Sequence, residues 1–273
     1  MAALRIAVQN KAGAEQCRAE GQTIVWLAQE GEYQPGDRIV FTTDEFPAYY
    51  FIQVDGGMAE AYVYLTQGRI EYPIPFEPEA EAYGALRLSY CPGSFAGARH
   101  YIAMRKATPQ ENAAYRNLAL NPMDRGGAAG CWPHVQANVA TKGPIAPVFA
   151  PRNVIDGVLA NAEHWPWPFQ AWGIDQRPDA AITLEFGRPV DLEELWLVTR
   201  ADFPHDSWWK EATAVFSDGS SEVLPMQKSA APHIFPIRRQ GISWLRIERL
   251  VRADDPSPFP ALTQILAWGR NAE

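Results

Sequence analysis

Short β-prone segments closed by turn residues recur along most of this chain, and they limit its fold more than any other feature. Between residues 4 and 106 they cover 4–8, 23–27, 38–41, 49–54, 61–65 and 100–104. Turn signals such as Pro35-Gly36-Asp37 and Asp55-Gly56-Gly57 separate them. Short strands with Gly- and Pro-containing turns are typical of antiparallel sandwiches and barrels. The N-terminal part is therefore predicted to be all-β.

The same pattern resumes in the C-terminal half of the chain. Its β-prone segments are 180–186, 195–199, 212–216, 222–224, 242–248 and 264–269. Asp218-Gly219 is a strong hairpin signal between two of them. Because 273 residues exceed what one core usually fills, two domains are expected. We predict an all-β protein with two β-sandwich (jelly-roll) domains, 1–116 and 153–273, joined by a long irregular connector, 117–152.

One short helix is predicted where the first domain ends. Thr108 is a typical N-cap residue, and Pro109 at the first helical position and Glu111 in the first turn both favour a helix start there.

Composition excludes several classes of partner. A formal net charge of -8 argues against binding nucleic acid or an anionic membrane surface. No run reaches the roughly 18 apolar residues that a membrane span needs. Three widely spaced cysteines, without a CxxC pair, indicate reduced thiols and no zinc knuckle. A cytoplasmic location is expected, or a cell-surface or secreted one if a signal peptide has been removed; the oligomeric state is not predicted.

The segment 200–209 lies between two predicted strands and combines charged and aromatic side chains that are difficult to bury together. Sugars are bound by aromatic faces stacked on C–H patches and by planar polar side chains that pair with hydroxyls. This loop supplies both kinds of group. In the alternative interpretation, an Arg200–Asp202 ion pair braces the loop and one Trp fills the core. The predicted carbohydrate-binding residues of this loop are Arg200, Asp202, His205, Asp206, Trp208 and Trp209.

Three other segments contribute candidates. In 164–169, prolines stiffen an aromatic cluster, which either presents rings to a ligand or closes the end of the sandwich. Two adjacent carboxylates near residue 254 are solvated, bind a cation, or form an ion pair with Arg200. The connector supplies a histidine that would reach the site from outside the second domain. These further candidate binding residues are Trp165, Trp167, Asp254, Asp255 and His134.

The order of landmarks in the C-terminal half resembles the discoidin, or factor 5/8 type C, group of galactose-binding-like jelly rolls. The matching segments are 153–157, 182–190, a strand ending at Arg200, 216–220, 244–247 and 265–269. The resemblance implies that loops at one end of the sandwich hold a sugar. It also implies a structural calcium ion near Asp156. Gln264 stands where the family often has a ligating Glu, and losing one carboxylate weakens a calcium site.

The sequence therefore predicts a non-catalytic carbohydrate-binding protein, with no cofactor other than the calcium that the resemblance implies. One alternative is a sugar-active enzyme with paired carboxylates, as in glycoside hydrolysis. Another is a protein-interaction module. His205, Asp206 and Ser207 lie too close in sequence to form a hydrolase triad, and no nucleophile elbow or phosphate loop is present.

Overall fold

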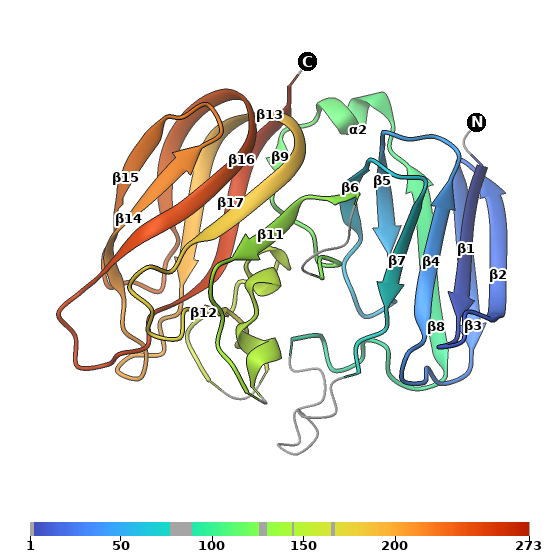
Figure 1. Ribbon diagram of the computed structural model, residues 1–273, viewed down its shortest axis with the longest axis horizontal. Helices are drawn as coiled ribbons and strands as arrows, with labels where there is room; N and C mark the ends of the chain where they lie inside the picture. The colour runs from blue at the N-terminus through green and yellow to red at the C-terminus, as the bar shows by residue number, and fades with distance from the viewer. Residues whose placement is uncertain (1–2, 77–88, 126–129, 144, 165–166, 273) are drawn as a thin grey trace.

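The computed structural model describes residues 3–76, 89–125, 130–143, 145–164 and 167–272. Strands dominate these residues, which confirms the all-β prediction (Figure 1). The α-helix described is α2 (Pro109–Ala113), whose N-cap is Thr108 as predicted. Glu111 completes a capping box with Thr108. Two short 3₁₀ helices, η1 (Ala146–Phe149) and η2 (Pro151–Ile155), lie between the short strands β11 (His134–Ala137) and β12 (Trp172–Gly173). No helix of the described chain is both long and apolar enough to cross a membrane.

The N-terminal domain is a sandwich of two antiparallel sheets, seen on the right of Figure 1. One sheet has the order β2-β1-β4-β7 and the other β10-β6-β5-β8-β3. Their strands are β1 (Ala3–Gln9), β2 (Glu15–Gln22), β3 (Ile24–Glu30), β4 (Arg38–Thr43), β5 (Ala48–Gln53), β6 (Ala61–Leu65), β7 (Arg69–Pro73), β8 (Arg99–Lys106) and β10 (Cys131–Trp132).

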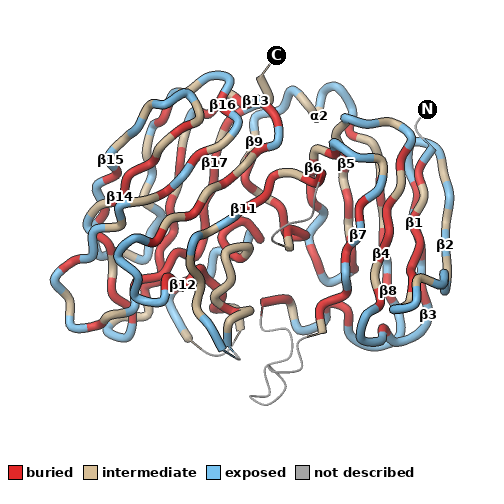
Figure 2. The backbone as a smooth tube through the Cα atoms, viewed as in Figure 1, coloured by how far each residue is buried: buried red, intermediate tan, exposed pale blue. Residues whose placement is uncertain are grey.

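Alternating side chains build the core between these two sheets. Along β3, Val25 and Leu27 are buried while Ile24 and Trp26 are exposed, because successive side chains of a strand point to opposite faces. Figure 2 shows the same alternation of buried and exposed positions along neighbouring strands.

The C-terminal domain is built on one eight-stranded sheet with the main order β12-β17-β13-β16-β14-β15. In addition, β11 pairs with β13 and β9 pairs with β17. The strands are β9 (Arg116–Asn117), β11 (His134–Ala137), β12 (Trp172–Gly173), β13 (Ile182–Thr199), β14 (Trp209–Phe216), β15 (Ser221–Pro225), β16 (His233–Arg252) and β17 (Ala261–Asn271).

The long strands β13 and β16 let this sheet fold around its own core. The register of β13 with β16 shifts between Glu185 and Val190, and bulges of this kind bend and twist a strand. Before the shift β13 lies beside β11, and after it β13 lies beside β17. Gly187 occupies the bend with φ +69, and the Trp132 ring fills the space where a Cβ would stand. Only glycine fits both conditions.

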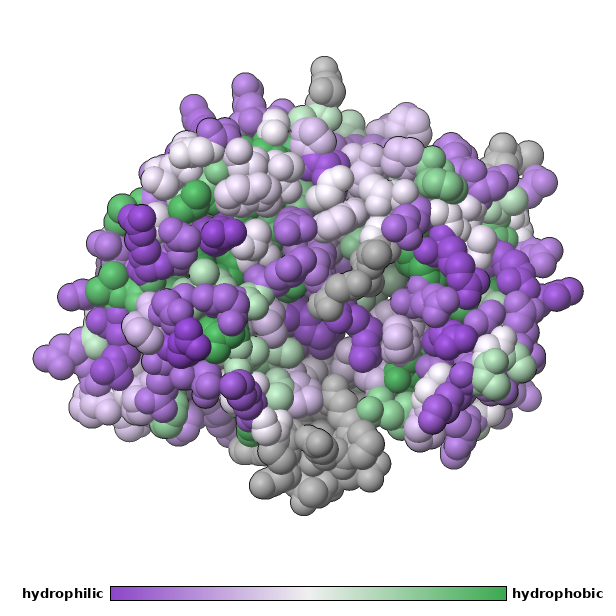
Figure 3. All heavy atoms as spheres, in the orientation of Figure 1, coloured by the Kyte–Doolittle hydropathy of each residue, from purple (hydrophilic) through white to green (hydrophobic). Residues whose placement is uncertain are grey.

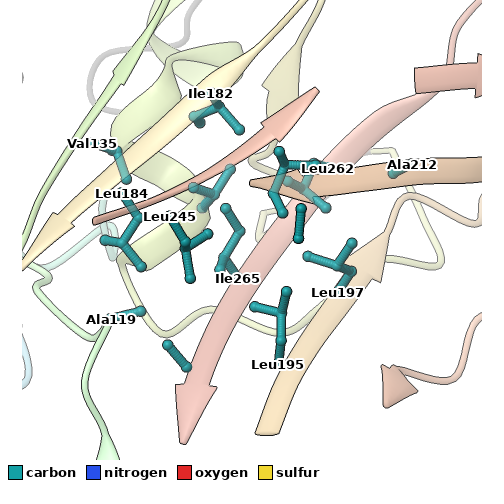
Figure 4. Packing of buried hydrophobic residues seen from close by; sticks show 14 of the residues in the cluster. Ala119, Val135, Ile182, Leu184, Leu195, Leu197, Ala212, Leu245, Leu262 and Ile265 are labelled. Atoms are coloured by element: carbon teal, nitrogen blue, oxygen red, sulfur yellow. The ribbon is translucent and has the colours of Figure 1, made fainter. Parts of the chain in front are cut away.

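Residues from several strands of the sheet form the core of this domain. Val135 of β11, Leu184 and Leu195 of β13 and Ile265 of β17 pack together, as Figure 4 shows. Because Leu184 and Leu195 lie on either side of the bend in β13, one strand contributes to both sides of the core.

The predicted irregular connector, 117–152, is mostly incorporated into the two domains. Its β11 extends the C-terminal sheet, and β10 extends the N-terminal one. Direct contacts also join the domains: Asn271 donates to the Tyr62 hydroxyl at 3.0 Å, and the Arg188 guanidinium lies 5.4 Å from the Tyr49 ring centre. Strands of two to four residues carry no periodicity, which is why the sequence gives no sign of them.

Candidate functional site

A cavity of about 260 Å³ opens beside the loop between β13 and β14. Four further loops or short elements reach it, since His164 precedes β12, Phe149 ends η1, Ile174 follows β12 and Phe259 precedes β17. Phe149, Ile174 and Phe259 give it an apolar wall, while His164 and the loop's own His205 supply polar groups. The cavity therefore combines groups that are distant in sequence.

Backbone contacts hold the β13–β14 loop in place beside the cavity. The Arg200 amide donates to the Ala261 carbonyl at 2.9 Å, and the Ser207 amide donates to the Phe259 carbonyl at 3.2 Å. The Ser257 hydroxyl donates to the His205 carbonyl. Loop 253–260 thus fixes the loop that carries His205.

Two histidines and two aspartates meet at one end of the cavity. Nδ1 of His164 lies 2.8 Å from Oδ2 of Asp202, and Nε2 lies 3.7 Å from Oδ1 of Asp206. Nδ1 of His205 lies 3.3 Å from the same Oδ1 of Asp206. The two imidazole rings are 4.4 Å apart between centres. These four side chains form one connected polar cluster.

The hydrogen bonds favour one tautomer of His164. The Asp202 carboxylate can only accept a hydrogen bond from Nδ1 of His164. Arg200 Nη2, which lies 3.1 Å from the same nitrogen, can only donate one to it. The shorter contact assigns the proton to Nδ1, so the Nε2 lone pair is free to face Asp206 and the cavity. Burial lowers the pKa of His164, which favours its neutral form, and the hydrogen bond from His164 lowers the pKa of Asp202.

Arg200 does not line the cavity, contrary to the prediction that it contacts a sugar. Its side chain is 0% exposed. It donates to the carbonyls of Glu163 at 2.6 Å and Phe169 at 3.2 Å, and its Nε lies 3.5 Å from Asp206. The bracing interpretation is thus closer to the structure, with Asp206 in place of Asp202 as the paired acid. Arg200 directly follows β13, whose last residues from Leu197 to Thr199 are all buried, and it continues this buried run.

The two adjacent tryptophans differ in burial at the point where β14 begins. Trp209 is 2% exposed and belongs to the core, so it is not the surface platform that was predicted, while Trp208 is half-buried. Trp167 is also half-buried, and Trp165 lies outside the described residues. The aromatic rings that do line the cavity are Phe149 and Phe259. The sequence does not single out Phe259, because it follows Asp254-Asp255 in a polar, proline-rich segment.

The remaining predicted residues lie away from the cavity. His134 is buried on β11, with Nδ1 2.7 Å from Asp124, and does not reach the site. Asp255 forms an ion pair with Lys228 at 3.1 Å, so the pair with Arg200, one of the alternatives considered for these carboxylates, does not form. Asp254 is exposed and does not line the cavity.

The surroundings of Asp156 do not fit a calcium ion. Gln264 accepts from the Gly157 amide at 3.1 Å, and this contact orients its Nε2 toward the Asp156 carboxylate, 2.7 Å away. Gln170 donates to the other oxygen at 3.2 Å, and the Val158 amide donates at 2.8 Å. Amide donors therefore surround a carboxylate that would need further oxygen ligands to hold calcium.

Comparison with known proteins identifies similar solved structures, and sugar-binding modules are among them. The module CpGH89CBM32-4, produced by Clostridium perfringens and in complex with GlcNAc-alpha-1,4-galactose, is 15% identical with a TM-score of 0.39, covering 60% of this chain and 100% of its own. The lectin domain of Lectinolysin complexed with Lewis B antigen is 11% identical with a TM-score of 0.42, covering 57% and 97%. A Streptococcus pneumoniae fucose binding module, SpX-3, is 14% identical with a TM-score of 0.38, covering 55% and 96%.

No family model matches this chain, and no curated protein matches it either. Each of these three modules is covered almost in full, whereas the matches take in little more than half of this chain.

Proposed function

We propose that this protein binds carbohydrate without catalysis, and that the sugar occupies the cavity between His164, His205 and Phe259. The observation that carries this proposal is the pairing of an exposed aromatic ring with polar groups at one opening. Phe259 is 48% exposed, and its ring lies 5.8 Å from that of His205 at an angle of 18°. A sugar ring can stack on Phe259 while its hydroxyls bond to the imidazoles.

The size of the cavity favours a small ligand. At about 260 Å³ it falls below the range of roughly 300–1,000 Å³ that is usual for drug-sized ligands. We infer that one sugar unit enters it, with any further units lying in solvent.

The carboxylates support binding over glycoside hydrolysis. Hydrolysis needs a carboxylic acid whose pKa is raised so that it can donate a proton. The pKa of Asp202 is instead lowered by its hydrogen bond with His164, and Asp206 is occupied by Arg200 and by the Asp202 amide, 2.8 Å away. Both acids serve to hold the loop and its histidines.

The surface offers less support for a protein-interaction module. On the face shown in Figure 3, hydrophobic residues among the coloured atoms form small separate groups between hydrophilic ones. Protein docking sites usually present a broad contiguous apolar patch.

The test is a glycan array followed by calorimetric titration of the best sugar against wild type, Phe259→Ala and Phe46→Ala. Phe46 is a matched control because it is 51% exposed on the other domain. Loss of a stacking ring should weaken binding roughly ten-fold, while the control should bind like wild type. Equal affinity in all three proteins would place the sugar elsewhere, and the absence of any glycan ligand would refute the function.

A further inference from the structure

We infer that His164, His205 and Asp206 form a binding site for a divalent transition-metal ion of the zinc type. This inference does not depend on sugar binding. Ligand atoms of His164, Asp202 and His205 all lie within 4.8 Å of one another, and Asp206 stands between the two histidines.

The two distances from the Asp206 carboxylate to the imidazole nitrogens are close to those found around a small ion. Zinc binds imidazole nitrogen and carboxylate oxygen at about 2.0–2.2 Å, so neighbouring ligands of a tetrahedral site lie roughly 3.3–3.5 Å apart. Oδ1 of Asp206 is 3.3 Å from Nδ1 of His205 and 3.7 Å from Nε2 of His164. The His205 side chain is 57% exposed and can rotate to close the remaining distance.

The surrounding hydrogen bonds hold the donors in the form that a metal requires. A metal-binding histidine usually donates its second ring N–H to a carboxylate, which fixes the tautomer and the ring orientation. Asp202 accepts from Nδ1 of His164 at 2.8 Å and from its backbone amide at 3.2 Å, and therefore has this supporting role.

Asp206 is oriented in the same way. Its Oδ2 accepts from the Asp202 amide at 2.8 Å and faces the Arg200 guanidinium at 3.5 Å. Its Oδ1 is left for the two imidazoles, and the whole side chain is only 3% exposed.

The ligand types identify the class of ion. Two imidazoles and one carboxylate suit zinc and neighbouring transition metals, whereas calcium and magnesium prefer oxygen ligands throughout. Three protein ligands also leave one coordination position for water or another small donor.

The experiment is calorimetric titration of the full chain with Zn²⁺ after chelator treatment, repeated with Co²⁺ while its visible absorption is recorded. We expect one ion per chain with micromolar or tighter affinity, and cobalt bands typical of nitrogen–oxygen coordination. His164→Ala and His205→Ala should each weaken zinc binding by more than about 100-fold, and Asp202→Asn by roughly 10–100-fold. His233→Ala is the matched control, since His233 does not line the cavity and bonds instead to the Gln227 and Leu197 carbonyls.

His205→Ala keeps the test valid if other variants fail to fold, because the side chain it removes is largely exposed; circular dichroism checks the fold. No saturable zinc binding in the micromolar range would overturn the inference. So would zinc binding that is unchanged in both cavity histidine variants, or lost equally in His233→Ala. Sugar titrations run in chelator test the proposed function separately.

Discussion

Nδ1 of His164 lies 2.8 Å from Oδ2 of Asp202, although 38 positions separate the two residues in the chain. This contact joins the loop before β12 to the loop after β13 and orients the imidazole toward the cavity. Because the carboxylate stabilises the protonated ring, replacing Asp202 removes a charge that raises the pKa of His164. In Asp202→Asn the pKa of His164, followed by proton NMR, should fall below its wild-type value. An unchanged pKa would mean that this pair is not formed in solution.

Arg200 should be essential for stability and not directly for ligand contact. Removing one partner of a buried ion pair costs about 3–5 kcal/mol, because the other charge stays buried without compensation. Arg200→Met leaves Asp206 in that state and should lower the free energy of unfolding by this amount, as measured in urea. Arg177→Met is the control, since Arg177 pairs with Asp179 on the surface and should change stability by less than about 1 kcal/mol. Similar values for both variants would contradict the burial of Arg200.

The two adjacent tryptophans should differ in their effect on folding. Trp209 fills the core, so Trp209→Ala should lower the free energy of unfolding by about 3–5 kcal/mol. Trp208→Ala should cost less than half as much, since its side chain is only half-buried. Urea unfolding of both variants makes the comparison, and equal losses would contradict the difference in burial between the two indoles.

Asp156 should make stability depend on pH in the weakly acidic range. Burial raises the pKa of its carboxyl group to about 6, from an ordinary value of 3.8. Between these values the folded chain binds more protons here than the unfolded chain, so the contribution of Asp156 to stability is greatest at low pH and falls as the pH rises to 6. The stability of wild type minus that of Asp156→Asn should fall by roughly 3 kcal/mol across this range. A difference that is independent of pH would contradict the raised pKa.

Gln264 can be converted into the carboxylate that calcium would need. In Gln264→Glu, two carboxylates face each other and the donor to the Asn153 carbonyl, 2.5 Å away, is lost. Without calcium this variant should be about 2–4 kcal/mol less stable than wild type. Millimolar calcium should restore part of the loss and leave wild type unchanged, as measured by thermal unfolding. If calcium changed the stability of both proteins equally, the Gln264 amide would not be the group that prevents calcium binding in wild type.

Local signals in the sequence located many of the strands and the loop that borders the cavity. The segments 195–199 and 212–216 lie within β13 and β14 as expected, because their β-branched and aromatic residues suit a buried sheet. The bend at Gly187 was not foreseen, so 182–186 and 195–199 were read as two strands where the chain forms one.

The composition of the cavity was only partly predictable. His205 and Asp206 border it from the predicted loop, whereas His164 and Phe259 arrive from segments that lie more than 35 residues away in either direction. Periodicity reports which face of an element is apolar, and it contains no information on which loops meet in space. Arg200 shows the opposite error, since a charged residue in a loop reads as exposed unless its buried carbonyl partners are known.

The short strands β9, β10 and β11 limit where this chain can be divided into separate genes or fragments. Ala119 and Val135 precede residue 153 but pack in the C-terminal core, and Cys131 packs in the N-terminal one. A gene fragment starting at residue 153 would therefore encode a sheet without two of its strands, and its core would open to water. The two halves therefore cannot be exchanged between proteins as separate units. Any recombinant protein that keeps this architecture has to include residues 117–152 unchanged.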